Sequence, residues 1–530
     1  MELRSRCNPG LPRLAWCARV NRGVDQVTVE HGPWVEVQPQ FFFEGAWSGP
    51  FEAAALYEAT AVLGSGGMLH GDDVVFIPSS HTLERLYSVR LPDAVLVSNS
   101  LVYLLAVLGD ALDPAYIGYE ADFLSILKGY HRARRSIPTR ARRKVTLHYH
   151  ARLRVGRDLA ARDEPPPPLP RIPDYHSYVS HLEQIARDCV ENARDRRRTV
   201  RYAPLASVST GYDSPACAVV ARACGCDSAV TFARARMELN ASDPSDADDG
   251  GEAIAERLGM AVEVFDRSSY LERSDHPEAE FLATGNGGDD VIMSVLADRL
   301  PGTVFFTGFR GDTIWGFSPQ AEQDSAHFRS KDPSGASLGE FRLRLGFIHA
   351  PLPVLTMPRH GDILAISQSP EMAPWRLGND YDRPIPRRLV ESSGVSREAF
   401  GQEKKAITQP FWVTRDNTSM FSGSSWKAIE QFSHELGRRN RESLLHRVRR
   451  GWAFLCLSAV WRGGVLAERL DIRFSVRLPM GLRLLTSETG YKFHWAVSLL
   501  YDRYSSSTLG PAGAAESFEL GSPLPGAVRD

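Results

Sequence analysis

Residues 205–219 read LASVSTGYDSPACAV, an apolar run followed by a small, hydroxyl-rich turn and then by an apolar stretch with helical spacing. This pattern predicts a strand, a turn and a helix. Such a turn presents backbone N–H groups and the positive end of the helix dipole, so its usual ligand is an anion such as phosphate. Ser209, Thr210 and Ser214 would add hydroxyl donors, and Gly211 would allow the backbone to approach the ligand closely.

Asp213 also lies in this turn, where a carboxylate alone would repel an anion. The aspartate fits if Mg²⁺ lies between it and phosphate groups, because Mg²⁺ prefers carboxylate and phosphate oxygens. The turn lacks the lysine of the G-x-x-x-x-G-K-[ST] loop, so it is not the nucleotide loop of the common NTPases. Serine and aspartate are also ordinary helix caps, and a purely structural turn is the alternative.

Strands and helices alternate on both sides of the turn. Strands are predicted at residues 203–209, 228–233, 261–266 and 302–309, and helices at 175–195, 214–225, 248–260 and 289–300. This alternation predicts a doubly wound parallel sheet, in which ligands bind at the carboxyl ends of the strands. The turn quoted above is one such end.

A second turn has the same character. Residues 304–317 read VFFTGFRGDTIWGF, an apolar run followed by glycines and one aspartate, Asp312. Two neighbouring strand ends, each with one carboxylate beside a glycine, suit a Mg²⁺-pyrophosphate group. STGYDS resembles the S-G-G-x-D-S pyrophosphate loop of the asparagine synthetase-like enzymes, and TGFRGD resembles their second motif, S-G-E-G-x-D-E. DDGGEAIAERLG and GVSREAFGQEKKA are similar to later segments of that family, and the resemblance covers roughly residues 40–420.

The resemblance implies a site for ATP and Mg²⁺. Asp213 and Asp312 would hold Mg²⁺, and Lys404 would contact the departing phosphates, with its neighbour Lys405 as the alternative. Adenine would lie around Thr231 and against two other ATP-binding residues, Val208 and Phe232. The resemblance further assigns to ATP binding Ser209, Thr210, Gly211, Ser214, Gly308 and Gly311.

The chemistry implied by the resemblance is adenylation. A substrate carboxylate attacks the α-phosphorus, pyrophosphate departs, and an amine then displaces AMP to give an amide-type bond. We expect an AMP-forming ligase of bacterial specialised metabolism, such as natural product biosynthesis, acting on a small-molecule carboxylate and an amine. The alternatives are a catalytically silent nucleotide-binding or scaffold protein and an ammonia-dependent amide synthetase.

The sequence departs from the family motifs at three positions. Thr210 replaces the second glycine of the first motif, which the turn tolerates only if φ is negative there. Phe309 replaces a glutamate or tyrosine, and phenylalanine cannot move protons. Thr313 replaces the glutamate after the second aspartate. We therefore expect either another base or an acceptor amine that loses its proton easily.

The stretch ATGNGGDDVIM at residues 283–293 is expected near the mouth of the cleft. Asn286, Asp289 and Asp290 are candidate substrate-binding residues there, together with Phe309. Asp289 or Asp290 could bind or deprotonate a substrate amine. The alternative is a glycine turn that caps a helix.

Residues 84–106, ERLYSVRLPDAVLVSNSLVYLLA, are similar to a strand-and-helix stretch of the N-terminal glutaminase domain of the same family, which has the αββα architecture of Ntn hydrolases. Position 2 is Glu2 where glutamine-dependent members have a cysteine. We expect the fold without glutaminase activity, as in β-lactam and carbapenam synthetases, so the nitrogen would not come from glutamine. The expected division is a degenerate glutaminase-like domain (1–160), a proline-rich linker (161–174), a synthetase domain of the ATP-pyrophosphatase type (175–505) and a disordered tail (506–530).

The charge composition limits the classes of binding partner that we expect. Lys and Arg number 62 and Asp and Glu 64, a formal net charge of −2, which gives no global basic surface for a nucleic acid. A basic cluster at residues 132–144 is interpreted as a solvated loop, with phosphate or RNA binding as the alternative.

The 7 cysteines are scattered and predict no disulfide framework. No apolar run of about 18 residues predicts a membrane span. We expect a cytoplasmic protein and leave open whether it forms a homodimer.

Overall fold

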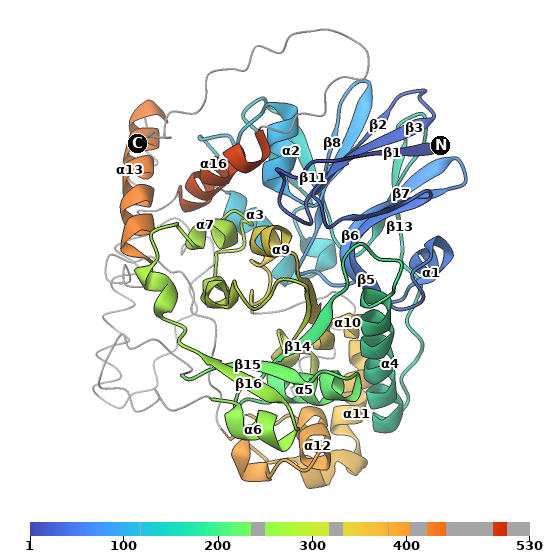
Figure 1. Ribbon diagram of the computed structural model, residues 1–530, viewed down its shortest axis with the longest axis vertical. Coiled ribbons are helices and arrows are strands. Elements are labelled where there is room, and N and C mark those ends of the chain that lie inside the picture. The colour runs from blue at the N-terminus through green and yellow to red at the C-terminus, as the bar shows by residue number, and fades with distance from the viewer. Residues whose placement is uncertain are drawn as a thin grey trace.

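The computed structural model describes residues 1–116, 118–234, 250–316, 332–379, 381–402, 421–440 and 491–505. Within these ranges the chain forms three sheets surrounded by helices, so the mixed α/β class that we predicted is confirmed (Figure 1). Two sheets come from residues 1–164, and the third comes from residues 203–351. The predicted tail at residues 506–530 lies outside the described residues.

The first two sheets pack face to face as a sandwich. The seven-stranded sheet has the order β1 (Glu2–Cys7), β3 (Gln26–His31), β2 (Trp16–Asn21), β9 (Ala94–Ser98), β8 (Leu86–Arg90), β11 (Lys144–His148) and β10 (Ser136–Pro138). The six-stranded sheet has the order β13 (Ala161–Glu164), β12 (Arg152–Val155), β7 (Asp73–Ile77), β6 (Val62–His70), β5 (Phe41–Trp47) and β4 (Glu36–Gln38). The strand β1 runs parallel to β3, and the other pairs of these sheets are antiparallel.

Alternate residues of the strands fill the space between the two sheets. Trp16, Ala18 and Val20 alternate along β2, and Val74 and Phe76 alternate along β7. Because side chains of a strand point alternately to opposite faces, this spacing gives each sheet a buried inner face. The rings of Trp16 and Phe76 stack with 6.2 Å between their centroids, so the two sheets are in direct contact.

Helices cover the outer faces of the sandwich. On the seven-stranded sheet, α2 (Leu101–Leu108) packs on β9 and β2, and α16 (Lys492–Ser505) packs on α2. On the six-stranded sheet, α1 (Ala53–Glu58) places Leu56 against Phe41 and Phe43 of β5. The layers are therefore helix, sheet, sheet, helix.

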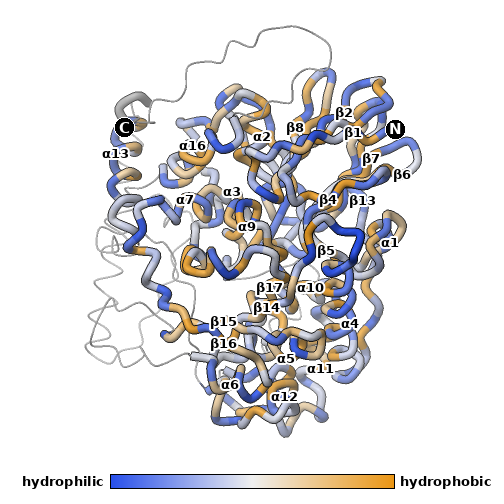
Figure 2. Tube along the Cα trace, in the orientation of Figure 1, coloured by the Kyte–Doolittle hydropathy of each residue, from blue (hydrophilic) through white to orange (hydrophobic). Residues whose placement is uncertain are grey.

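The connector after the sandwich leads into a long helix. The predicted linker, residues 161–174, starts as β13 and has no regular secondary structure from residue 165 to 173. The helix α4 (Tyr175–Ala193) follows, capped by the Asp174 carboxylate. Its buried side chains recur every three or four residues, at Tyr175, Tyr178, Leu182, Ile185, Cys189 and Ala193. Hydrophilic residues lie between them, as an amphipathic helix requires (Figure 2).

The third sheet is parallel and doubly wound. Its strand order is β16 (Ala261–Phe265), β15 (Ser228–Phe232), β14 (Ala203–Ser207), β17 (Thr303–Thr307) and β18 (Ile348–Pro351), and every neighbouring pair is parallel. The chain runs outward from β14 through β15 to β16, and then crosses to the other side of β14 for β17 and β18. The strand order therefore reverses between β14 and β17.

The remaining α-helices in the described ranges are α3 (Tyr119–Leu124), α5 (Asp213–Ala223), α6 (Glu252–Arg257), α7 (Glu278–Leu282), α8 (Gly311–Ile314), α9 (Gly339–Leu345), α10 (Leu352–Leu355), α11 (His360–Gln368), α12 (Pro384–Ser392) and α13 (Gly423–Asn440). The α-helix predicted at residues 289–300 was wrong, because this segment is a 3₁₀ helix over Val291–Leu296. It begins in tight turns, with φ of +90° at Gly287 and +86° at Gly288. No helix in these ranges is long and apolar enough to cross a membrane.

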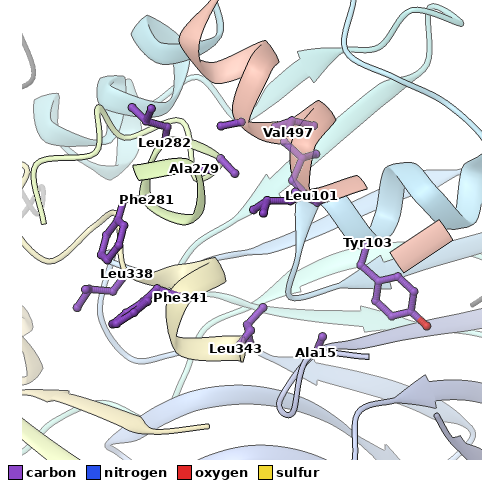
Figure 3. Packing of buried hydrophobic residues seen from close by; sticks show 14 of the residues in the cluster. Ala15, Leu101, Tyr103, Ala279, Phe281, Leu282, Leu338, Phe341, Leu343 and Val497 are labelled. Atoms are coloured by element: carbon purple, nitrogen blue, oxygen red, sulfur yellow. The ribbon is translucent and has the colours of Figure 1, made fainter. Parts of the chain in front are cut away.

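The sandwich and the third sheet share one hydrophobic cluster. In Figure 3, side chains of α2, α7, α9 and α16 converge, among them Leu101, Phe341 and Val497. A buried ion pair adds to this contact, because Arg342 of α9 donates to both carboxylate oxygens of Glu44 in β5, at 2.6 and 2.8 Å. These contacts, with those between β18 and β6, fix the sandwich against the β18 edge of the parallel sheet.

Candidate active site

The turn after β14 leads directly into α5 and carries hydroxyl groups at the edge of the sheet. The hydroxyl oxygens of Ser209 and Ser214 are 2.8 Å apart, and the Gly211 N–H donates to Ser209 Oγ at 3.3 Å. The φ of Thr210 is not positive, so threonine fits this position without backbone strain. The hydroxyls, the backbone N–H groups and the start of α5 therefore lie together.

The turn after β17 touches the first turn through two glycines. A Cβ atom at Gly308 would lie 2.5 Å from the carbonyl carbon of Asp213, and one at Gly311 would lie 2.4 Å from Asp213 Cγ. Side chains do not tolerate contacts this short, so only glycine allows this approach. The structure thus brings together the two motifs that are far apart in the sequence, at the point where the strand order reverses.

Arg383, at the start of α12, forms an ion pair with Asp213 through Nη1 and Oδ2. Burial acts to lower the pKa of Arg383, but the carboxylate of Asp213, with a smaller contribution from Asp312, outweighs it and raises the pKa. One arginine therefore interacts with both predicted metal ligands. Sequence reasoning missed Arg383, which is 170 residues from Asp213 and lies in no recognised motif.

Aromatic rings and a second arginine surround this ion pair. The Arg383 guanidinium lies 5.0 Å from the ring centre of Tyr381, and that of Arg387 lies 4.9 Å from the ring centre of Tyr212. The Tyr212 hydroxyl accepts a hydrogen bond from Arg387 Nε at 3.1 Å. These contacts hold the start of α12 against the first turn.

The segment predicted to supply a lysine begins beside the first turn. The Gly401 N–H donates to the carbonyl oxygen of Thr210 at 2.7 Å, and a Cβ at Gly401 would meet the Tyr212 ring at 2.5 Å. Lys404 and Lys405 themselves lie outside the described residues. Their predicted contact with phosphates stays a prediction.

The residues expected near adenine follow or end adjacent strands. Val208 follows β14 and donates its N–H to the carbonyl of Val230 at 3.0 Å. Thr231 in β15 accepts a hydrogen bond from the Gly251 N–H at 2.8 Å through its hydroxyl. Val208 and Thr231 are buried and Phe232 is half-buried. Val208 and Phe232 pack in different hydrophobic clusters, so the structure does not bring these side chains together on one surface.

The three polar residues that we predicted to bind the substrate, Asn286, Asp289 and Asp290, are in different surroundings. Asp290 is fully buried, and its carboxylate accepts hydrogen bonds from the N–H groups of Gly335 and Ser337 and from the Ser337 hydroxyl, at 2.6 to 2.9 Å. Asn286 donates to the carbonyl of Ala336 at 2.6 Å. Both hold the loop at residues 335–337. Asp289 is also buried.

Phe309 offers no group for proton transfer and packs against a buried histidine. The rings of Phe309 and His349 lie 5.6 Å apart in an edge-to-face arrangement. His349 Nε2 is 2.8 Å from Thr307 Oγ1, and burial holds the pKa of His349 well below its usual value. Thr313 donates its hydroxyl to Asp312 Oδ1 at 3.5 Å, a long hydrogen bond.

The described residues offer two carboxylates, Asp213 and Asp312, as ligands for a metal. No group of three or more His, Cys, Asp or Glu side chains within the described ranges is arranged to hold a metal ion. Mg²⁺ is usually bound by one or two carboxylates together with substrate phosphates and water. The two aspartates therefore suit Mg²⁺ that arrives with a nucleotide, and the ion would compete with Arg383 for Asp213.

Comparisons with known proteins add no family to this description. No protein-family model matches the chain. No curated protein matches it either. The function is therefore inferred from the residues described above.

Proposed function

We propose that the protein is an ATP-dependent, AMP-forming ligase that adenylates a substrate carboxylate and joins it to an amine. The observation that carries this proposal is the contact of the turns after β14 and β17 through Gly308 and Gly311. This contact lies where the strand order reverses, which is the usual ligand site of a doubly wound sheet. Each turn brings one carboxylate, Asp213 or Asp312, to that place.

The layers of the fold support the same proposal. The helix–sheet–sheet–helix sandwich is what we expect of a glutaminase-like αββα domain, and the doubly wound sheet is what we expect of an ATP-pyrophosphatase-type domain. The buried thiol of Cys17, whose pKa burial raises, is unsuited to act as a nucleophile. We therefore propose that nitrogen comes from an amine substrate and not from glutamine.

Each part of the site has a role in this reaction. The N–H groups at the start of α5 and the hydroxyls of Ser209 and Ser214 would bind phosphate oxygens. Asp213 and Asp312 would hold Mg²⁺, which when bound would stabilise charge on the pyrophosphate. Arg383, displaced from Asp213 by the metal, would bind a phosphate oxygen, for which its planar guanidinium is suited.

The acceptor amine is proposed to lose its proton without a strong base. Phe309 carries no titratable group, and Asp290 already accepts several hydrogen bonds within the protein. An amine of low basicity, such as a hydrazine or a hydroxylamine, needs little help to lose a proton. Asp289 is the remaining candidate for an activating carboxylate near the cleft.

The test is the exchange of labelled pyrophosphate into ATP with a panel of carboxylic acids. We expect exchange with at least one acid and release of AMP in the full reaction. The substitutions Asp213→Asn and Asp312→Asn should each abolish exchange and leave the circular dichroism spectrum unchanged. Asp227→Asn, at an exposed ion pair with Arg222, is the matched control and should retain exchange. Release of ADP, or full exchange in either site variant, would refute the assignment.

A second candidate is a nucleotide-binding protein without catalysis. The ion pair between Arg383 and Asp213 favours it, because the guanidinium already neutralises one of the two carboxylates. This candidate predicts that MgATP binds and that no carboxylate supports exchange. An ammonia-dependent amide synthetase would instead give exchange with its acid and form product with ammonium chloride as the only amine.

A further inference from the structure

Arg310 lies in the second turn, and its side chain points into the protein. The residue is 2% exposed, and its Nη1 donates to Thr82 Oγ1 at 3.3 Å, in the loop after β7. Within the described part of the chain, Nε and Nη2 of Arg310 are buried and have no hydrogen-bond partner. Unsatisfied buried N–H groups are costly, so such groups usually bind water or a ligand.

The backbone conformation of Arg310 is one that glycine would adopt more easily than arginine. Its φ of 59° and ψ of 18° are in the left-handed region, which glycine adopts without strain and other residues adopt at a cost. A glycine at this position would avoid both the backbone cost and the burial of a charge. The arginine side chain therefore indicates a function that offsets both costs.

His81, on which the charge of Arg310 acts, and its neighbour His349 also have unsatisfied nitrogens. Both ring nitrogens of His81 and the Nδ1 of His349 are buried and have no hydrogen-bond partner in the described ranges. The two rings lie 6.2 Å apart. Burial lowers the pKa of His81 to about 3, with the charges of Arg342 and Arg310 adding to the effect, so His81 is neutral at physiological pH. The cluster thus offers one positive charge and several N–H donors.

We propose that Arg310, with His81 and His349, binds a carboxylate of a substrate. Nε and Nη2 are on the same edge of the guanidinium, and this edge holds a carboxylate through two parallel N–H···O bonds. A monoanion also matches the charge of the cluster, since both histidines are neutral. Arg310 is two residues from Asp312, so the cluster adjoins the site proposed for ATP.

The assignment of this carboxylate to a substrate of the ligase rests on the proposed function. A carboxylate whose oxygens are both bound to Arg310 is a poor nucleophile, so we assign this group to recognition and not to adenylation. One of the two substrates would then be an amino acid or a dicarboxylic acid, with a second carboxylate that does not react.

Water is the rival occupant of the cluster. A cavity of about 30 Å³, large enough for a water molecule, is lined by Leu83, Ala336 and Arg342, and Arg310, His81 and His349 are not among its lining residues. The carboxylates of Asp332, Asp290 and Asp312 also affect Arg310 electrostatically, although no described carboxylate forms an ion pair with it. Charged and uncharged probes separate a bound carboxylate from bound water.

The experiment measures thermal unfolding of the full chain without ATP or Mg²⁺. The probes are acetate, succinate and β-alanine, compared with acetamide, succinamide and sodium chloride at equal ionic strength. We expect a concentration-dependent rise of the Tm with at least one carboxylate and with no amide. A stronger effect of succinate would indicate a dicarboxylic acid, and a stronger effect of β-alanine an amino acid. No rise with any carboxylate, or an equal rise with its amide, would mean that water alone binds and would overturn the proposal.

Variants locate the effect. Arg310→Met should fold, because it removes a buried charge that has no ion-pair partner, and it should weaken the response to the carboxylate by roughly 30-fold or more. Arg299→Met, at a surface ion pair with Glu263, should respond like the unmodified chain. If Arg310→Met does not fold, Arg310→Lys is the variant that tests the proposal. Lysine keeps the positive charge but cannot donate two parallel hydrogen bonds to a carboxylate. An unchanged response in either Arg310 variant would overturn the proposal, whatever the exchange assay shows.

Discussion

Replacing Gly308 with alanine tests the central feature of the proposed site, which is the contact of the two turns. The φ of Gly308 is outside the left-handed region, so alanine meets no backbone strain there. The new Cβ would lie 2.5 Å from the carbonyl carbon and 2.6 Å from the Ser214 nitrogen, both backbone atoms at the start of α5. The effect of Gly308→Ala therefore comes from this contact alone.

The magnitude follows from the overlap. Carbon atoms in contact prefer separations of about 3.5–4.0 Å, so the second turn must move by roughly 1 Å or push α5 away. Overpacking of this kind typically costs about 1–3 kcal/mol. We expect Gly308→Ala to lower the free energy of unfolding by that amount and to abolish ATP–pyrophosphate exchange, because Asp213 and Asp312 would no longer be aligned.

Two other glycines serve as matched controls. A Cβ at Gly211 would meet Ser209 Oγ at 3.5 Å and the Tyr381 hydroxyl at 3.7 Å, which are ordinary contacts. Gly211→Ala should keep the free energy of unfolding within about 0.5 kcal/mol and still lose exchange, since the methyl group would lie 3.5 Å from Ser209 Oγ, which is proposed to bind phosphate. Gly423→Ala meets no atom within 4 Å and should change neither quantity. Urea denaturation and the exchange assay measure both. Wild-type stability together with wild-type exchange in Gly308→Ala would refute the reasoning.

Three further predictions concern stability and nitrogen. Arg342→Met leaves Glu44 buried without its partner and should cost about 3–5 kcal/mol in urea denaturation, whereas Arg222→Met at an exposed pair should cost under about 1 kcal/mol. His81 lies close to Arg342, Arg310 and His150, and its pKa is about 3 in the folded protein and about 6.5 in the unfolded chain. Between these two pH values only the unfolded chain takes up a proton at His81. Stability should therefore fall as the pH drops from 6.5 toward 3, and His81→Gln should make that fall less steep by about 1.4 kcal/mol per pH unit. Incubation with ¹⁵N-amide glutamine and ATP should give no labelled product, and label in the product would contradict the proposed source of nitrogen.

The parallel sheet and the two turns could be predicted because their signals are local. β14 and β17 are each an apolar run that ends in small residues and glycine, and the doubly wound topology follows from the alternation of strands and helices, although β18 was not predicted. That the two turns would lie at neighbouring strand ends followed from the rule that parallel strands end at one edge, whereas the contact of Gly308 and Gly311 with Asp213 is seen only in the structure. The helix predicted at residues 289–300 was wrong because glycine turns and the buried Asp290 fix its start, and neither effect appears in the hydrophobic pattern.

The charged partners could not be predicted, because tertiary contacts decide them. Arg383 and Arg310 look like any of the many arginines of this chain until the fold buries them. Asp290 shows the converse, since an aspartate beside glycines was a candidate for substrate binding and the fold surrounds it with N–H donors. Sequence can identify a residue type suited to a reaction, whereas burial and partners decide whether that residue is available.

The charges at the site bear on the choice between a ligase and a silent binding protein. Asp213 forms an ion pair with Arg383, and Asp312 acts on the same guanidinium more weakly through its charge, so neither Mg²⁺ nor phosphate alone would satisfy all three groups. A metal without phosphate would leave Arg383 buried and unpaired, and phosphate without a metal would face two carboxylates. In the proposed site MgATP would satisfy all three together, because the metal would bind the carboxylates and the phosphates would bind Arg383. The ion pair between Arg383 and Asp213 was given above as support for a silent binding protein. A ligase site that is specific for the metal–nucleotide complex would contain the same ion pair before the complex binds, so the ion pair is compatible with both candidates.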